Sequence, residues 1–93
     1  MTAADWIAHL HLTPHPEGGY FRRIYTAPLA LHPPDRHGPR PLLTAIHYLL
    51  PAGQRSRLHR LKSAELWFFQ LGAPLSVHAL DTGGDYRCLR LGS

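Results

Sequence analysis

Proline and glycine are unusually frequent in this sequence and limit how long its helices and strands can be. Nine prolines and eight glycines occur among 93 residues. Because both residue types interrupt regular secondary structure and favour turns, this frequency predicts short elements joined by many turns. The pattern favours an all-β fold. The length allows one domain at most, and a chain this short buries only roughly 60–65% of its unfolded surface.

Composition predicts a soluble globular protein. The hydrophobic fraction of 44% is ordinary for a folded domain. The N-terminus lacks the basic start and long apolar run of a signal peptide, and no stretch approaches the ~18 apolar residues that a membrane span requires. Cys88 is the single cysteine, which excludes an internal disulfide and fits a reducing compartment. We therefore expect a cytoplasmic protein with no membrane partner.

The net charge does not indicate a nucleic-acid partner. The formal charge of +4 results from ten basic residues, nine of them arginines, against six acidic ones. A basic balance signals nucleic-acid binding when the charges cluster on one face or helix. Here the arginines are scattered, so no nucleic-acid partner is expected.

The chain is expected to begin with a short helix. Thr2 followed by Asp5 has the form of an N-cap with an acidic partner three residues on. The residue before Pro14 avoids helical angles, so the helix and its cap lie within residues 1–13. Residues 14–19 contain two prolines and two glycines and are expected to form a fixed, tight turn.

The rest of the chain has the composition of strands and turns. A surface loop is expected at 26–41, and strands at 20–25, 42–50, 57–61, 65–71, 75–80 and 86–91. The segments 57–61 and 65–71 flank a three-residue turn and are expected to pair as an antiparallel hairpin. We find no repeat and no second domain.

The predicted hairpin brings two chemically competent side chains together. Leu61 and Glu65 are expected to lie opposite each other, with His59 two residues before Leu61. Opposite residues, and residues i and i+2, point to the same face, so His59 and Glu65 project together. Imidazole and carboxylate can ligate a divalent metal or act as a proton-transfer pair. The alternatives are an ion pair of Glu65 with Arg57 or Arg60, and a structural histidine bonded to a backbone carbonyl.

The spacing around this pair resembles a known motif. Gly53 is followed after five residues by His59, and Glu65 is followed after six residues by Gly72. This pattern resembles the first motif of the cupin superfamily. The segments PHPEGGYFR (14–22), TAIHYLL (44–50) and SRLHRLKSAELWFFQLGAPL (56–75) are similar to one uncharacterised cupin family. The resemblance implies a jelly-roll-like β-barrel, represented here by its incomplete, N-terminal portion.

Four positions depart from the pattern that the resemblance implies. Leu61 replaces the second histidine of the motif's His-x-His pair. Members of the similar family commonly have a His-Arg-aliphatic run in place of this pair. That family commonly has an acidic residue at the position of Ala64 and a histidine at the position of Phe68. Arg23 stands where an acidic residue is frequent.

The resemblance also implies which residues bind a ligand. His59 and Glu65 are the candidate catalytic pair. The candidate ligand-binding residues are Glu17, Tyr20, Arg22, His47 and Ser63. Trp67 and Phe69 are expected to serve in packing.

Metal binding is an open alternative. Metal-binding cupins hold iron, zinc, nickel or manganese, and their second motif supplies a further histidine. His59 and Glu65 alone would bind such a metal weakly, unless His47 or His78 faces the same cavity. Other histidines at 9, 11 and 15 lie where a helix gives way to a turn, so no fixed face is expected to collect them. Cys88 has no base beside it in sequence and is expected to be an inert core thiol.

The sequence therefore leaves three hypotheses for the function. The first is a barrel that binds a small polar, sugar- or nucleotide-like molecule, with epimerase- or isomerase-like proton transfer by His59 and Glu65. The second is a metal-dependent isomerase or dioxygenase. The third is a truncated, non-catalytic binding or assembly module. Because an incomplete barrel leaves open strand edges, we expect a homodimer or another strand-pairing oligomer.

Overall fold

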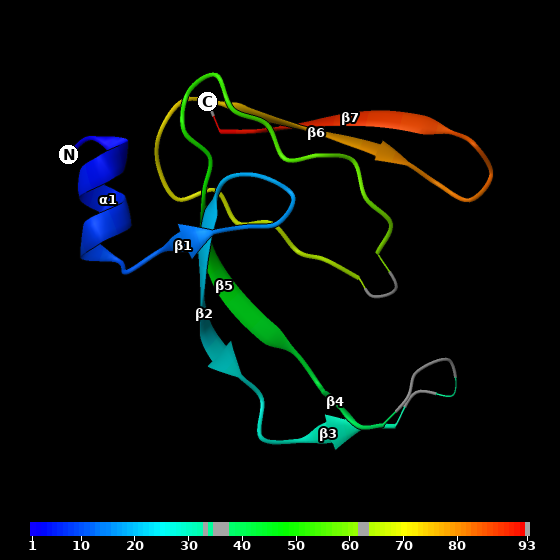
Figure 1. Cartoon of the computed structure of the whole chain (residues 1–93). Coiled ribbons are helices and arrows are strands. Elements are labelled where there is room, and N and C mark those ends of the chain that lie inside the picture. The colour runs from blue at the N-terminus through cyan, green and yellow to red at the C-terminus, as the bar shows by residue number, and fades with distance from the viewer. Residues whose placement is uncertain (33, 35–37, 62–63, 93) are drawn as a thin grey trace. The chain divides into compact units, whose positions relative to one another are not determined.

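The structure is a computed structural model that describes residues 1–32, 34, 38–61 and 64–92. The chain divides into two compact units, residues 1–57 and 58–93. Figure 1 labels the helix and the strands of the two units.

The first unit begins with helix α1, Ala3–His9, as the sequence predicts. The Thr2 hydroxyl accepts a hydrogen bond of 3.1 Å from the backbone N–H of Asp5, and the Asp5 carboxylate accepts one of 2.9 Å from the backbone N–H of Thr2. This reciprocal pair is a capping box, which satisfies donors that the helix leaves unpaired. After the helix, Leu12 is buried, with 7% of its surface exposed.

A three-stranded antiparallel sheet forms the centre of this unit. Its order is β1 (Thr13–Pro14), β2 (Tyr20–Thr26) and β5 (Thr44–Leu49). Strands β2 and β5 lie side by side over most of their length (Figure 1). The strands predicted at 20–25 and 42–50 are confirmed, the second one shorter than expected.

A β-bulge in β2 changes which side chains share a face. Arg23 pairs with Ile46, but the next pair joins Tyr25 to Ala45, so Ile24 is the extra residue. A bulge shifts the alternation of side chains by one position. Tyr25 consequently lies on the face that simple alternation would assign to Ile24.

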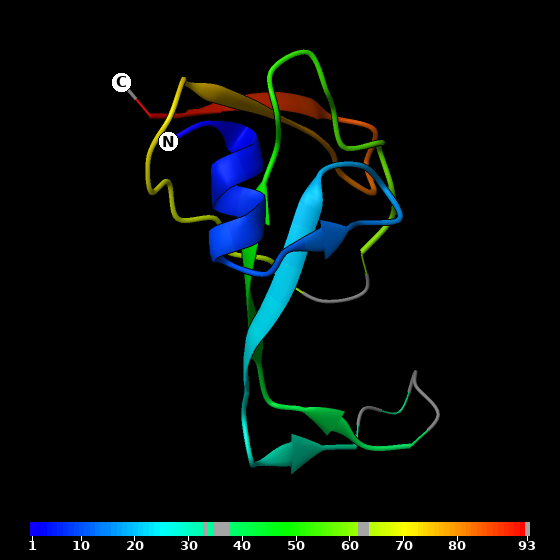
Figure 2. The same cartoon turned by 60° about the vertical axis from the view of Figure 1, so that its left-hand side comes forward.

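Residues 26–41, expected as a surface loop, contain two very short paired strands. Strand β3 (Ala30–Leu31) pairs with β4 (Arg40–Pro41). Backbone bonds from Ala27 to the Leu43 carbonyl and from Leu42 to the Leu29 carbonyl, of 2.9 and 2.8 Å, lie between this pair and the β2–β5 ladder. Strands β3 and β4 therefore continue the ribbon of β2 and β5 at its far end (Figure 2).

The second unit contains one hairpin, formed by β6 (Leu75–Leu80) and β7 (Tyr86–Leu91). Both strands have the predicted boundaries. The Asp81 carboxylate closes the turn between them by accepting 2.9 Å hydrogen bonds from the backbone N–H groups of Gly83 and Asp85. An aspartate that bonds its own turn in this way explains why the chain reverses there.

The hairpin predicted at 57–61 and 65–71 is wrong. Neither 57–61 nor 65–71 forms a strand. Leu58, Leu66 and Phe68 are 74%, 82% and 75% exposed, so these segments bury too little apolar surface to stabilise a ladder. Phe69 instead packs against the end of β7, because a Cβ added at Gly92 would lie 2.9 Å from its ring.

The described residues form a very small apolar core. Leu12 is the one buried large hydrophobic residue among them, while apolar side chains of both units are exposed. Burial of apolar surface is the main stabilising contribution to folding. The stability of each unit therefore depends strongly on turns and strand pairing.

Candidate functional site

The turn at His15–Gly19 is tied to the rest of its unit by backbone hydrogen bonds. His15 donates to the Gly19 carbonyl at 2.8 Å, and Gly18 donates to the His15 carbonyl at 3.0 Å. The backbone N–H of Arg57 donates to the Glu17 carbonyl at 2.7 Å. The rigid turn expected from the prolines and glycines is therefore present, and it holds Glu17 in a half-buried position.

Two glycines allow this close approach. Gly18 has φ of 116°, and a Cβ there would lie 2.3 Å from the carbonyl oxygen of Arg55. Gly19 has φ of 75°, and a Cβ there would lie 2.6 Å from the Tyr48 hydroxyl. Both positions thus exclude any larger residue on backbone conformation and on space.

The His15 side chain has a structural role in the same turn. Its Nδ1 accepts a 3.0 Å hydrogen bond from the backbone N–H of Glu17. Its ring makes edge-to-face contacts with Phe21 and Tyr48, with centroids 4.8 and 5.7 Å apart. The hydrogen bond and the two ring contacts hold the His15 side chain against its own turn and the β2–β5 pair.

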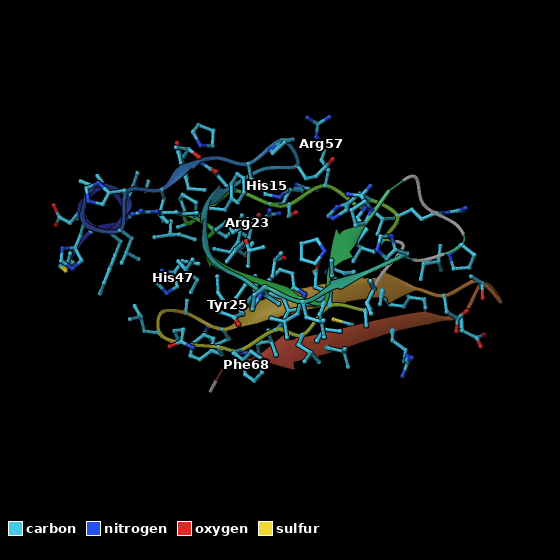
Figure 3. All side chains as sticks on the ribbon, turned by 90° about the horizontal axis from the view of Figure 1, so that it is seen from below. His15, Arg23, Tyr25, His47, Arg57 and Phe68 are labelled. Carbon is cyan, nitrogen blue, oxygen red and sulfur yellow. The ribbon has the colours of Figure 1, made fainter. Side chains whose placement is uncertain are left out.

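Phe21 and Tyr48, which His15 contacts, lie on one face of the β2–β5 pair. Polar and aromatic side chains gather on the opposite face. Arg22 and His47 are directly opposite each other in the strand register. Tyr20 shares their face by alternation, and Tyr25 joins it because of the bulge. In Figure 3, Tyr25 and His47 lie on one side of the strand pair, and His15 and Arg23 lie on the other. We call Tyr20, Arg22, Tyr25 and His47 the polar face.

The polar face combines partial burial with access to solvent. Tyr20 and His47 are half-buried, whereas Arg22 and Tyr25 are exposed. Directly opposed residues in an antiparallel pair have Cβ atoms about 4.5–5.5 Å apart. A guanidinium and an imidazole at that separation can both donate hydrogen bonds to one anionic group.

His59 and Glu65 are exposed residues of the second unit. The strand register that was expected to pair them is not formed, so their joint orientation stays a prediction from the motif. The Glu65 carboxylate accepts a 2.7 Å hydrogen bond from Nε1 of Trp67. Trp67, which we expected only to pack, therefore orients the candidate catalytic carboxylate. Ser63 lies outside the described residues.

The residues that the structure describes do not fit a resident metal centre of the cupin kind. No three histidine, cysteine, aspartate or glutamate side chains come together in the described part of the chain. His78, considered as a possible further ligand, contacts the Tyr86 hydroxyl instead. No step is therefore derived through a metal at His59 and Glu65.

Sequence reasoning missed two residues of the first unit, Tyr48 and Tyr25. Tyr48 donates a 2.6 Å hydrogen bond to the Gly18 carbonyl. Its position next to His47 in a predicted strand gave no signal for that long-range contact. Tyr25 was visible as a strand aromatic, but its face depends on a bulge that alternation does not predict.

Comparisons with known proteins support the resemblance seen in the sequence. The crystal structure of protein SO0799 from Shewanella oneidensis is similar, with a TM-score of 0.87 and 33% sequence identity. The similarity covers all of this chain and 56% of that protein, so the chain spans little more than half the length of its solved relative. Comparison with proteins of curated function gave no match.

The arrangement of elements agrees with that similarity. The described residues are mostly strands with one short N-terminal helix, as expected for a cupin-like β fold. None of the helices that the structure describes has the length and apolar character needed to cross a membrane. The family model described as "Cupin superfamily (DUF985)" matches residues 4–93, and the chain therefore belongs to this family.

Proposed function

We propose that this cupin binds a small, polar, anionic molecule of the sugar-phosphate or nucleotide type on its polar face. The observation that carries the proposal is the direct opposition of Arg22 and His47. A guanidinium offers a planar pair of donors that matches phosphate or carboxylate oxygens. An imidazole opposite it supplies another donor to the same group.

The two tyrosines extend the polar face beyond a simple anion site. Tyr20 and Tyr25 lie on the same face as Arg22. Tyrosine offers an apolar ring for a sugar or base and a hydroxyl for hydrogen bonding. The set therefore suits a ligand that joins an anionic group to a ring better than it suits a free inorganic anion.

From the motif, we also propose that His59 and Glu65 of the second unit act as a proton-transfer pair. An imidazole and a carboxylate can exchange the roles of general acid and general base. The Trp67 N–H donates a 2.7 Å hydrogen bond to a carboxylate oxygen of Glu65 and so orients this carboxylate. Proton removal next to a carbonyl, followed by return of a proton, is the epimerase- or isomerase-like reaction that such a pair can perform.

Calorimetric titration tests the binding part of the proposal. UDP-glucose, inorganic phosphate and glucose are the three probes. We expect UDP-glucose to bind most tightly and glucose most weakly. Arg22→Ala should weaken UDP-glucose binding by about tenfold or more, since a hydrogen bond to a charged group contributes about 1.5–3 kcal/mol. Arg87→Ala, a substitution of an exposed arginine on β7, is the matched control. Equal loss in both variants would contradict the proposal.

Solvent deuterium exchange tests the proton-transfer part. Ketose and aldose phosphates are incubated with the protein in D2O, and deuterium at the carbon next to the carbonyl is measured by mass spectrometry. Glu65→Gln should abolish exchange, and Trp67→Phe should slow it with little change in KM. Exchange that persists in both Glu65→Gln and His59→Ala would exclude this pair from the chemistry.

The exposed apolar side chains favour assembly as a second function. Leu58, Leu66 and Phe68 are largely exposed in the second unit. Apolar surface of this kind is typical of sites that bind another protein surface. A chain that binds none of the three probes but forms a defined oligomer would favour assembly over small-molecule binding.

A further inference from the structure

One face of the β6–β7 hairpin carries three side chains with metal-binding atoms. His78 and Cys88 are direct partners in the strand register, and Tyr86 pairs with Leu80. Because side chains alternate between faces, His78, Tyr86 and Cys88 all lie on the same face. Tyr86 is therefore the diagonal cross-strand neighbour of His78. An aromatic side chain is long enough to reach a residue at this diagonal position.

His78 and Tyr86 are in direct contact. The Nδ1 atom of His78 lies 2.5 Å from the Tyr86 hydroxyl oxygen. The two rings are stacked, with centroids 5.8 Å apart and an interplanar angle of 22°. This contact fixes the direction in which both polar atoms point.

Cys88 completes the group. Cys88 is the direct cross-strand partner of His78, whose Nδ1 contacts the Tyr86 hydroxyl, so the thiol and the phenol both neighbour the same imidazole. The sequence predicted an inert core thiol at Cys88. The core placement is wrong, because Cys88 is exposed and lies opposite His78 in the strand register.

We propose that His78, Tyr86 and Cys88 form a zinc-binding site on the exposed face of the β6–β7 hairpin. Thiolate sulfur and imidazole nitrogen are the ligands that Zn²⁺ binds most often in proteins. The phenol oxygen supplies a third ligand, and solvent completes a tetrahedral set. The site is separate in sequence from His59 and Glu65 and independent of the function proposed above.

The spacing of the three groups suits this ion with small adjustments. Two ligands of a tetrahedral zinc ion lie roughly 3.3 Å apart, given bonds of about 2.0–2.1 Å to nitrogen and oxygen. His78 Nδ1 and the Tyr86 oxygen must therefore separate by about 1 Å, which side-chain rotation on an exposed face can supply. Binding releases the thiol proton of Cys88 and the phenol proton of Tyr86 to solvent, so no oxidant or reductant is needed.

Arg90 is expected to weaken the binding of zinc at this site. It is the charged residue that shares this face of the described hairpin, and it lies two residues beyond Cys88, on the side away from Tyr86. A nearby positive charge disfavours cation binding. Replacement of Arg90 by serine should consequently tighten zinc binding.

Cobalt titration of the reduced full chain tests the site. Co²⁺ occupies zinc sites and shows a near-ultraviolet charge-transfer band only when a thiolate ligates it. We expect one Co²⁺ per chain with that band, intense visible bands of tetrahedral geometry, and displacement by Zn²⁺. Cys88→Ser should remove the charge-transfer band.

Variants distinguish a zinc site from contacts that only stabilise the hairpin. His78→Ala and Tyr86→Phe should each weaken Zn²⁺ binding by about tenfold or more, because even outer-shell partners of metal ligands contribute that much. His32→Ala is the matched histidine control and should leave the affinity unchanged. Tyr86→Phe keeps the stacked ring, so a folding defect is not expected to obscure the result.

Three results would overturn the zinc site. They are cobalt spectra without a thiolate band, equal Zn²⁺ affinity in Cys88→Ser, and one metal ion shared by two chains. UDP-glucose binding measured beside the metal titration should not change in His78→Ala, so failure of one proposal is distinguishable from failure of the other.

Discussion

The hydroxyl of Tyr48 donates a 2.6 Å hydrogen bond to the carbonyl oxygen of Gly18. Tyr48 is the neighbour of His47 on β5, and Gly18 follows Glu17 in the glycine-rich turn. The bond therefore connects the turn that carries one candidate ligand-binding residue to the strand that carries another. Residues 30 positions apart are held together by it.

Loss of this hydrogen bond should destabilise the first unit while the ring at position 48 keeps its contact with His15. Tyr48→Phe keeps the ring that contacts His15 but leaves the Gly18 carbonyl without this donor. We expect the free energy of unfolding in urea to fall by about 1 kcal/mol, the usual net worth of such a bond. An unchanged unfolding midpoint would show that the bond contributes nothing.

Gly18 should tolerate substitution less well than another glycine of similar conformation. Gly18 and Gly53 both have positive φ, but a Cβ at Gly53 would meet nothing within 4 Å. Gly53→Ala should therefore cost only the strain of about 1–2 kcal/mol. Gly18→Ala adds a clash with the Arg55 carbonyl, and we expect a total of about 3 kcal/mol or more. Equal unfolding midpoints of the two variants would contradict this account of the turn.

Helix α1 should lose its stabilisation in acid. The backbone N–H of Thr2, and then its side chain, hold the pKa of Asp5 below its ordinary value of 3.8. A carboxylate with a lowered folded-state pKa stabilises the fold above its unfolded-state pKa, and this contribution disappears as the pH falls through the folded-state value. Far-ultraviolet circular dichroism should therefore show helix loss below about pH 4 that Asp5→Asn does not show. The same acid transition in both proteins would exclude Asp5 as its source.

The sequence predicted the elements whose signals are local. Thr2 and Asp5 define the start of α1, and the turn at 81–85 defines the ends of β6 and β7. The hairpin at 57–61 and 65–71 failed because apolar content indicates a strand only when a neighbour covers it, and Leu66 and Phe68 are exposed.

The candidate site was predictable only in part. Arg22 and His47 were candidates from the resemblance, yet their opposition depends on the register between two distant strands. Tyr25 needed the bulge at Ile24, and Cys88 needed the cross-strand partner His78. Each of these relationships is set by pairing, which periodicity in one segment does not determine.

The exposed apolar surface predicts association with a second copy. Neither β6 nor β7 has a further strand partner among the described residues, and open edges of this kind favour pairing between chains. Light scattering should therefore give a defined mass of two chains, and unfolding midpoints should rise with protein concentration. A monomer that unfolds cooperatively in dilute solution would contradict this expectation.

The most direct test of the central claim is where a nucleotide-type probe binds. UDP-glucose is titrated into the isotope-labelled chain, and backbone amide shifts are followed by nuclear magnetic resonance. The account predicts that amides of Tyr20–Thr26 and Thr44–Leu49 shift in a saturable manner that Arg22→Ala abolishes. Saturable shifts confined to other segments, or shifts that survive Arg22→Ala unchanged, would show that the polar face is not the binding site.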